Sequence, residues 1–132
     1  MKQLGATVAR HLKGGECIEL IGDVGAGKTT FVQGLGLGLG ADDTIQSPSF
    51  TISREYHCRD GLRLAHYDFY RLTNAGVMSY ELAESLQDQG CITVVEWAST
   101  ISAVLPREAI KISIESTPTD ETRIVTITGM TL

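Results

Sequence analysis

Residues 22–29 read Gly-Asp-Val-Gly-Ala-Gly-Lys-Thr, and they set the architecture expected for the chain. The octapeptide fits the phosphate-binding pattern GxxxxGK[ST], called Walker A, in which glycines let the backbone curl and aim successive N–H groups at a phosphate. In this pattern Lys28 reaches the β- and γ-phosphates, and the hydroxyl of Thr29 binds Mg²⁺. A strand should precede the loop, and the apolar residues 16–21 (ECIELI) fit one. A helix should follow, and we predict it over residues 30–39.

The predicted helix over residues 30–39 contains three glycines, at positions 34, 36 and 38. Each glycine in a helix interior costs roughly 0.5–1 kcal/mol relative to alanine, so the local sequence conflicts with the prediction. We keep the helix because the phosphate-binding loop requires one. We also expect the glycine face to allow close packing of this helix against the central sheet.

Apolar periodicity predicts the other elements. Leu4, Val8 and Leu12 indicate an N-terminal helix that ends at residues 14–15. The remaining predictions are strands over residues 49–57 and 62–70 joined by a hairpin turn at 59–61, a helix over 74–89, a buried strand over 91–95, a short helix over 99–105, and a terminal hairpin with strands around 110–114 and 125–127. Strands that alternate with helices favour an α/β fold. We therefore expect one P-loop NTPase-like domain over residues 1–132, a three-layer sandwich with a mainly parallel central sheet and an antiparallel hairpin.

Composition limits the possible functions. The 132 residues carry 11 Lys+Arg and 16 Asp+Glu, a net charge of −5, which argues against strong direct binding of nucleic acid. No stretch approaches the roughly 20 apolar residues that span a membrane. The three cysteines, Cys17, Cys58 and Cys91, form no CxxC pair. We therefore expect free thiols in a reducing cytoplasm rather than a cysteine metal site.

Two acidic residues close apolar strands and are candidates for metal binding and catalysis. Glu96 follows residues 91–95 (CITVV), a pattern close to Walker B, and it would face the phosphates if this strand neighbours the strand before the loop. Asp68 lies in the segment HYDFYR. Either carboxylate could hold Mg²⁺ or orient the attacking water. The alternatives are an ordinary ion pair between Asp68 and Arg71, and a helix N-terminal acid at Glu96.

Other polar residues give weaker signals. The two-residue period of a strand places His66 and Asp68 on one face. Arg71 could reach a γ-phosphate or form a surface ion pair. Ser47, in the segment Ser-Pro-Ser, could belong to a loop that senses the γ-phosphate, or to a simple turn. Trp97, the single tryptophan, could flank the nucleotide or belong to the core.

Four segments occur together in a recognisable order and spacing: GDVGAGKTTF (22–31), SPSFTI (47–52), HYDFYRL (66–72) and VVEWA (94–98). In these segments the chain resembles the TsaE family, small bacterial P-loop ATPases that are required for the threonylcarbamoyl modification of adenosine in tRNA. The resemblance covers nearly the whole chain. It implies ATP and Mg²⁺ as cofactors, and the proteins TsaB and TsaD as partners.

The resemblance also implies roles for single residues. Thr29 and Glu96 would serve Mg²⁺, Asp68 would be functionally important, and Ser47 would belong to a switch-like loop. We therefore expect Lys28, Asp68 and Glu96 to be catalytic, Asp68 to be a further metal ligand, and Arg71 and Trp97 to act with the switch-like loop. The residues expected to bind nucleotide are Asp23, Val24, Gly25, Ala26, Gly27, Lys28, Thr29 and Thr30.

The leading hypothesis is an accessory protein that binds ATP and hydrolyses it slowly without its partners. A P-loop small-molecule kinase is one alternative, but it would need a lid with several arginines, and no arginine cluster is evident. A nucleotide-dependent assembly module that does not hydrolyse ATP is another. A GTPase that recognises guanine through NKxD is excluded, because the single asparagine, Asn74, precedes an alanine. The family also has a strand before the first helix, which we expect to be missing here.

Overall fold

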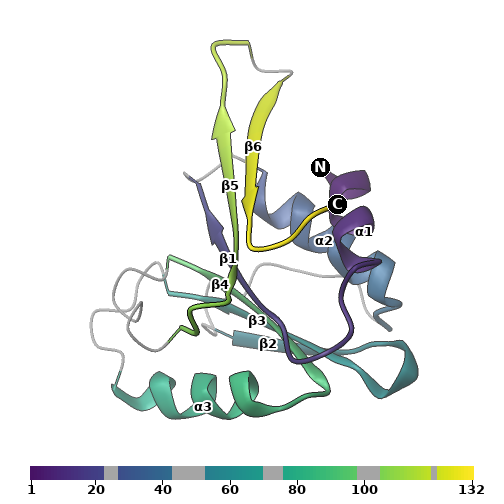
Figure 1. Cartoon of the computed structure of the whole chain (residues 1–132), viewed down its shortest axis with the longest axis vertical. Helices are drawn as coiled ribbons and strands as arrows, with labels where there is room; N and C mark the ends of the chain where they lie inside the picture. The colour runs from purple at the N-terminus through teal and green to yellow at the C-terminus, as the bar shows by residue number, and fades with distance from the viewer. Residues whose placement is uncertain (23–26, 43–52, 70–75, 98–104, 120–121) are drawn as a thin grey trace.

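The computed structural model describes residues 1–22, 27–42, 53–69, 76–97, 105–119 and 122–132. Three α-helices, one short 3₁₀ helix and six strands lie within these ranges (Figure 1). In chain order they are α1 (Lys2–Ala9), β1 (Cys17–Ile21), α2 (Lys28–Leu39), β2 (Ser53–His57), η1 (Arg59–Gly61), β3 (Arg63–Asp68), α3 (Gly76–Gln87), β4 (Cys91–Glu96), β5 (Ile110–Ser116) and β6 (Arg123–Thr128). The short helix predicted over 99–105 and the first part of the strand predicted from residue 49 fall largely outside the described residues.

The six strands form one sheet in the order β2-β3-β4-β1-β5-β6. Strands β3, β4, β1 and β5 are mutually parallel along the middle of the sheet. Each edge is an antiparallel strand, β2 paired with β3 and β6 paired with β5. The predicted mainly parallel sheet with an antiparallel hairpin is therefore confirmed. The structure adds where the two predicted hairpins lie, because each of them supplies one of the two outer strands of the sheet.

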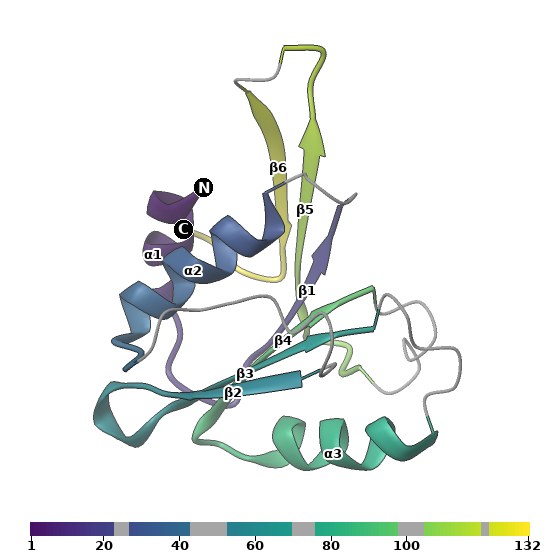
Figure 2. The same ribbon diagram turned by 180° about the vertical axis from the view of Figure 1, so that it is seen from behind.

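The sheet lies between two helical layers, with α1 and α2 on one face and α3 on the other (Figures 1 and 2). Because side chains alternate along a strand, each face builds its own core. On the α2 side, strand residues such as Ile18 and Val94 pack with Phe31 and Leu35. On the α3 side the core is smaller and includes Tyr67. The three-layer arrangement follows directly from strands that are apolar on both faces.

Two of the three glycines of α2, Gly34 and Gly38, face α1, so the expectation that they pack against the sheet was wrong for these two. A Cβ atom added to Gly34 would lie 2.1 Å from the Lys2 carbonyl oxygen, and one added to Gly38 would lie 2.6 Å from the Ala9 Cβ. Gly5 of α1 is equally close to α2. These close approaches leave no room for a side chain. The helix tolerates its poor propensity because glycine allows α1 to pack tightly along it.

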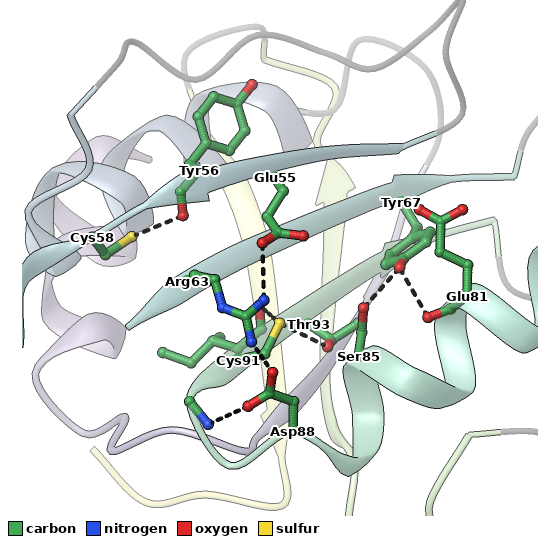
Figure 3. A network of polar contacts seen from close by, with 12 residues as sticks. Glu55, Tyr56, Cys58, Arg63, Tyr67, Glu81, Ser85, Asp88, Cys91 and Thr93 are labelled. Carbon is green, nitrogen blue, oxygen red and sulfur yellow. Dashed lines mark hydrogen bonds and ion pairs between the residues drawn. The ribbon is translucent and has the colours of Figure 1, made fainter. Parts of the chain in front are cut away.

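The predicted hairpin turn is confirmed at η1, where Asp60 and Gly61 have φ angles of 60° and 75°. Beyond it, Arg63 at the start of β3 pairs with Glu55 of β2, 3.1 Å between Nη1 and Oε1, and with Asp88 before β4 (Figure 3). The side chains are partly exposed, so each pair contributes little to stability. Together they join three chain segments at the end of the sheet where β3 and β4 begin.

All three cysteines are free thiols, and Cys17 and Cys91 are buried. Burial, with a smaller effect of Glu19, raises the pKa of Cys17 to about 12. Burial also raises the pKa of Cys58 and of Cys91 above its usual value. Within the described ranges, no helix has the length and apolar character needed to cross a membrane.

Candidate functional site

The carboxyl ends of the three parallel strands β1, β3 and β4 lie together along one side of the sheet. This side is called the carboxyl edge, and it is distinct from the outer strands β2 and β6. β1 pairs with β4 so that Leu20 lies opposite Glu96, and β3 pairs with β4 so that Asp68 lies opposite Glu96. The segment predicted to bind phosphate, residues 22–29, follows β1 immediately. The condition on which Glu96 was selected, that its strand neighbours the strand before the loop, is therefore met. In open α/β sheets this edge is where ligands bind.

Helix α2 begins at the same edge of the sheet. Its N-cap is Gly27, with a φ of 105° that only glycine adopts easily, and the Gly27 carbonyl accepts a hydrogen bond from Phe31 N at 2.9 Å. Lys28 is the first residue of the helix. A 12-residue helix presents unpaired N–H groups and a partial positive charge at this end, which favour an anion.

Lys28 turns back toward the sheet and is only 6% exposed. Its ammonium Nζ lies 3.6 Å from Glu96 Oε1 and 3.9 Å from the centroid of the Trp97 ring. Buried charges are costly unless they are paired. The carboxylate and the aromatic face together compensate the lysine inside the protein.

Glu96 is 3% exposed and is contacted through both of its carboxylate oxygens. Oε1 faces Lys28, and Oε2 lies 2.5 Å from Nε2 of His66. His66 is completely buried on β3. Its second ring nitrogen, Nδ1, has no hydrogen-bond partner among the described residues. The three side chains thus form one buried polar chain, Lys28–Glu96–His66, at the carboxyl edge of the sheet.

Trp97 directly follows Glu96 and has a φ of 57°, in the left-handed region. A bulky residue in this region costs on the order of 1–3 kcal/mol, and such strain concentrates at functional sites. The partly buried ring packs against the α3-side core and also covers the Lys28 ammonium. The prediction that Trp97 belongs to the core is therefore confirmed, whereas a contact of Trp97 with nucleotide stays a prediction.

The other predicted site residues divide into two groups. Asp68 and Thr29 are half-buried beside the edge described above, whereas Thr30 is exposed on α2. The remaining predicted residues lie outside the described ranges, so the structure does not locate their side chains: Asp23, Val24, Gly25, Ala26, Ser47 and Arg71. The alternative ion pair between Asp68 and Arg71 falls outside them for the same reason.

His66 is the residue that sequence reasoning missed. The strand period placed it on the same face as Asp68, which is the signal that could have identified it. What the period could not show is the partner strand. The register puts His66 opposite Val94, so Glu96, two residues further along β4, lies on the same face and within reach of the imidazole.

The residues at this edge fit a Mg²⁺ ion that is bound together with phosphate. The described residues contain no group of three or more His, Cys, Asp and Glu side chains that could hold a metal. Mg²⁺ commonly uses only one or two carboxylates, and completes its octahedral shell with water and substrate phosphate oxygens. Glu96, the neighbouring Asp68 and Thr29 carry hard oxygen atoms of the kind that Mg²⁺ prefers.

A cavity of about 580 Å³ lies at the opposite end of the strands, beside the first residue of β1. Its lining includes Gly15, Cys17, Gln87 and Glu108. It contains none of the residues of the Lys28–Glu96–His66 chain.

Comparison with known proteins places the chain in one group. Residues 1–125 match the family model described as threonylcarbamoyl adenosine biosynthesis protein TsaE. A tRNA threonylcarbamoyladenosine biosynthesis protein TsaE from Streptomyces coelicolor is 37% identical over 136 residues, which cover 98% of this chain and 90% of the relative. The protein of the same name from Bacillus subtilis is 40% identical over 130 residues, covering 98% and 79%. The crystal structure of Bacillus subtilis YdiB superposes with a TM-score of 0.72 at 37% identity, covering 96% of this chain and 76% of that one.

Proposed function

Because this chain belongs to the TsaE family of threonylcarbamoyl adenosine biosynthesis proteins, we propose that it binds ATP with Mg²⁺ and hydrolyses it slowly. It would act as an accessory protein in the threonylcarbamoyl modification of tRNA adenosine. The observation that carries the proposal is the meeting of Lys28, at the start of α2, with Glu96, at the end of the strand beside β1. That pairing would bring together the two parts of a nucleotide site, a cation for the phosphates and a carboxylate for the metal.

Each part of the site has a defined task in this proposal. The backbone of residues 23–27 and the N-terminus of α2 would hold the β-phosphate, and Lys28 would bind the β- and γ-phosphate oxygens. Thr29 and Glu96 would hold Mg²⁺, which when bound neutralises charge on the phosphates. Asp68, opposite Glu96 in the register, would orient the attacking water or contribute to the metal site. Ser47 and Arg71 stay predicted as members of a switch-like loop.

Lys28 must exchange partners for this to happen. In the structure its charge is compensated by Glu96 and Trp97. When a triphosphate occupies the loop, the ammonium would turn to the phosphate oxygens, and the carboxylate would be released for the metal. The lysine and the glutamate therefore exchange one ion pair for two new ones, which limits the electrostatic cost of opening the buried pair.

The proposed partners are TsaB and TsaD, and the proposed location is the cytoplasm. The net charge of −5 disfavours direct binding of tRNA by this chain, so contact with the substrate would come through partner proteins. A partner protein that excludes water from the bound nucleotide would be expected to accelerate hydrolysis. Free thiols at all three cysteines are compatible with a reducing compartment.

Phosphate release measured with the chain alone and with added TsaB and TsaD tests the proposal. We expect the wild-type chain to release phosphate slowly when it is alone and faster when TsaB and TsaD are added. The Lys28→Ala variant should release none, even with both partners. The same turnover with and without the partners would contradict the accessory role. A phosphorylated acceptor in place of free phosphate would identify a kinase. Full support of tRNA modification by a Glu96→Ala variant that releases no phosphate would identify a non-hydrolysing assembly module.

A further inference from the structure

We propose that His66 is a positioning residue for the nucleotide site. Its imidazole holds the Glu96 carboxylate in one orientation, so that one oxygen is fixed and the other faces Lys28 and the metal. This inference rests on the proposed function, because the carboxylate is held for Mg²⁺ bound with ATP. It gives a task to the one buried histidine that the proposed roles of Lys28, Asp68 and Glu96 leave unexplained.

Placement of His66 is set by the sheet. In the register between β3 and β4, His66 lies opposite Val94 and Asp68 lies opposite Glu96. Side chains two apart on one strand share a face, so His66 and Glu96 are diagonal neighbours on the α2 side. Nε2 of the imidazole is 2.5 Å from Glu96 Oε2, while Oε1 of the same carboxylate is 3.6 Å from Lys28 Nζ. The two oxygens therefore have different partners on different elements.

The contacts also define the tautomer of His66. The Lys28 ammonium on the other oxygen favours an ionised Glu96, so the hydrogen between Oε2 and Nε2 belongs to the imidazole. Nε2–H then donates to the carboxylate. Nδ1, buried and without a partner among the described residues, carries the lone pair, because a buried N–H without an acceptor would be costly. In this tautomer the imidazole acts as a single, directed donor.

A directed donor matters at this carboxylate because its terminal torsion is soft. Rotation about the last bond of a glutamate is broad and roughly two-fold, so Lys28 alone would not fix the plane of the oxygens. Mg²⁺ demands near-ideal octahedral geometry at short distance, so a rotated carboxylate binds it poorly. Hydrogen-bonded partners of metal ligands typically contribute 10–100-fold to metal affinity. The Nε2–H of His66 is placed to be such a partner.

Two amide variants form a matched pair for the test. In His66→Gln the amide nitrogen can take the place of Nε2, whereas in His66→Asn the side chain is too short to reach Oε2. The readout is the fluorescence of Trp97, the single tryptophan, which lies over Lys28. Mg²⁺ is titrated into protein saturated with a non-hydrolysable ATP analogue, and the analogue is separately titrated without Mg²⁺. The exposed histidine variant His57→Gln is the control.

We expect His66→Asn to raise the Mg²⁺ concentration at half-saturation by about 10–100-fold. Binding of the analogue without Mg²⁺ should stay unchanged, and His66→Gln and the control should stay near the wild type. An equal Mg²⁺ requirement in His66→Asn and the wild type would overturn the inference and leave the proposed function standing. No Mg²⁺-dependent response in the wild type would instead overturn the proposed function itself.

A second measurement needs no variant and therefore does not depend on whether a variant folds. Long-range ¹H–¹⁵N correlation spectra of the ligand-free protein report which ring nitrogen of His66 carries the hydrogen. We expect hydrogen on Nε2 and a bare Nδ1. Hydrogen on Nδ1 alone would remove the donor on which the inference depends and would overturn it.

Discussion

Lys28 and Glu96 are both charged and almost fully buried, an environment that is costly for a charged side chain. Such a pair contributes little as a stabilising contact, because desolvation of two charges offsets most of their attraction. Removing only one member is different, since it leaves the other charge buried without its partner. The buried ion pair is therefore better explained by a functional role than by a contribution to stability. Substitution of one member at a time tests this explanation.

Lys28→Ala should affect both nucleotide binding and folding stability. Loss of a charge-assisted contact to phosphate should weaken ATP binding by about 10–100-fold and reduce phosphate release below detection. The free energy of unfolding should fall by roughly 3 kcal/mol, because Glu96 loses its cation. Calorimetric titration with ATP and urea denaturation measure the two effects. Lys13→Ala, at an exposed position, is the control and should change neither.

Asp68→Asn should separate turnover from affinity. If the carboxylate acts on water or metal in the transition state, turnover should fall about 100-fold while ATP affinity changes little. Steady-state phosphate release and equilibrium binding of the nucleotide provide the comparison. Equal losses in both would place Asp68 in ground-state binding instead, and would contradict its assignment to catalysis.

Single functional residues could be predicted from the sequence where the residue type and its neighbours in the chain form a recognisable pattern. Lys28 was predicted because GKT belongs to a motif, and Glu96 because it ends an apolar strand. The contact of both with each other could not be predicted, since it depends on β4 lying next to β1. His66 was missed for a related reason. Its partner lies on a neighbouring strand, and the period within one strand gives no information about register.

Among the helices and strands, the packing of α1 on α2 shows how a tertiary contact can override local helix propensity. Periodicity predicted α1, although α1 ends at Ala9 and Leu12 is buried beyond it. Helix α2 was predicted from the loop motif that precedes it. The glycines of α2 were recognised as a conflict with helix propensity. The sequence could not show whether these glycines pack against the sheet or against α1, because that depends on how the two helices are placed in the folded protein. The close approach of the two helix backbones explains why glycine is used despite its low helix propensity.

Gly34→Ala should therefore destabilise the protein even though alanine favours helix. Propensity alone would stabilise α2 by roughly 0.5–1 kcal/mol. The added methyl, however, would meet Lys2 backbone atoms at 2.1–2.7 Å. We expect the free energy of unfolding to fall by about 1–3 kcal/mol, as for an overpacked core. Denaturation in urea measures the change.

Gly90→Ala is the matched control for this substitution. Gly90 has no positive φ in the left-handed range, and its added Cβ would lie 3.4 Å from Asp88 Oδ1 and 3.9 Å from the Gly61 carbonyl oxygen, which are ordinary contact distances. A loss of stability in the control as large as that of Gly34→Ala would show that helix contact is not the cause.

For the molecule as a whole, the α3-side core makes stability depend on alkaline pH. Burial raises the pKa of Cys17 from 9.0 to about 12, and burial likewise raises the pKa of Tyr67 from 10.0 to about 12. Above pH 9 the unfolded chain loses the Cys17 proton while the folded protein keeps it. The contribution of this thiol is therefore complete below pH 9 and is lost as pH rises toward 12.

Cys17→Ala should flatten this dependence. Between pH 9 and 10.5, the wild-type free energy of unfolding should fall more steeply than that of the variant, with a difference in slope that approaches about 1.4 kcal/mol per pH unit as pH rises. Urea denaturation in the presence of a reductant, repeated across this range, measures the difference. Cys58→Ala removes a thiol that is only half-buried, and it should change the slope less. Parallel curves for the wild type and Cys17→Ala would contradict the expected shift.

The close packing of α1 on α2 has a practical consequence at the amino end of the chain. Met1 precedes α1, and its side chain lies beside Gly27, where an added Cβ would come within 3.2 Å of the Met1 Cγ. A purification tag fused ahead of Met1 would therefore start next to the helix end that is proposed to hold the phosphates. Recombinant protein for binding studies should therefore carry no tag ahead of Met1 when nucleotide is added.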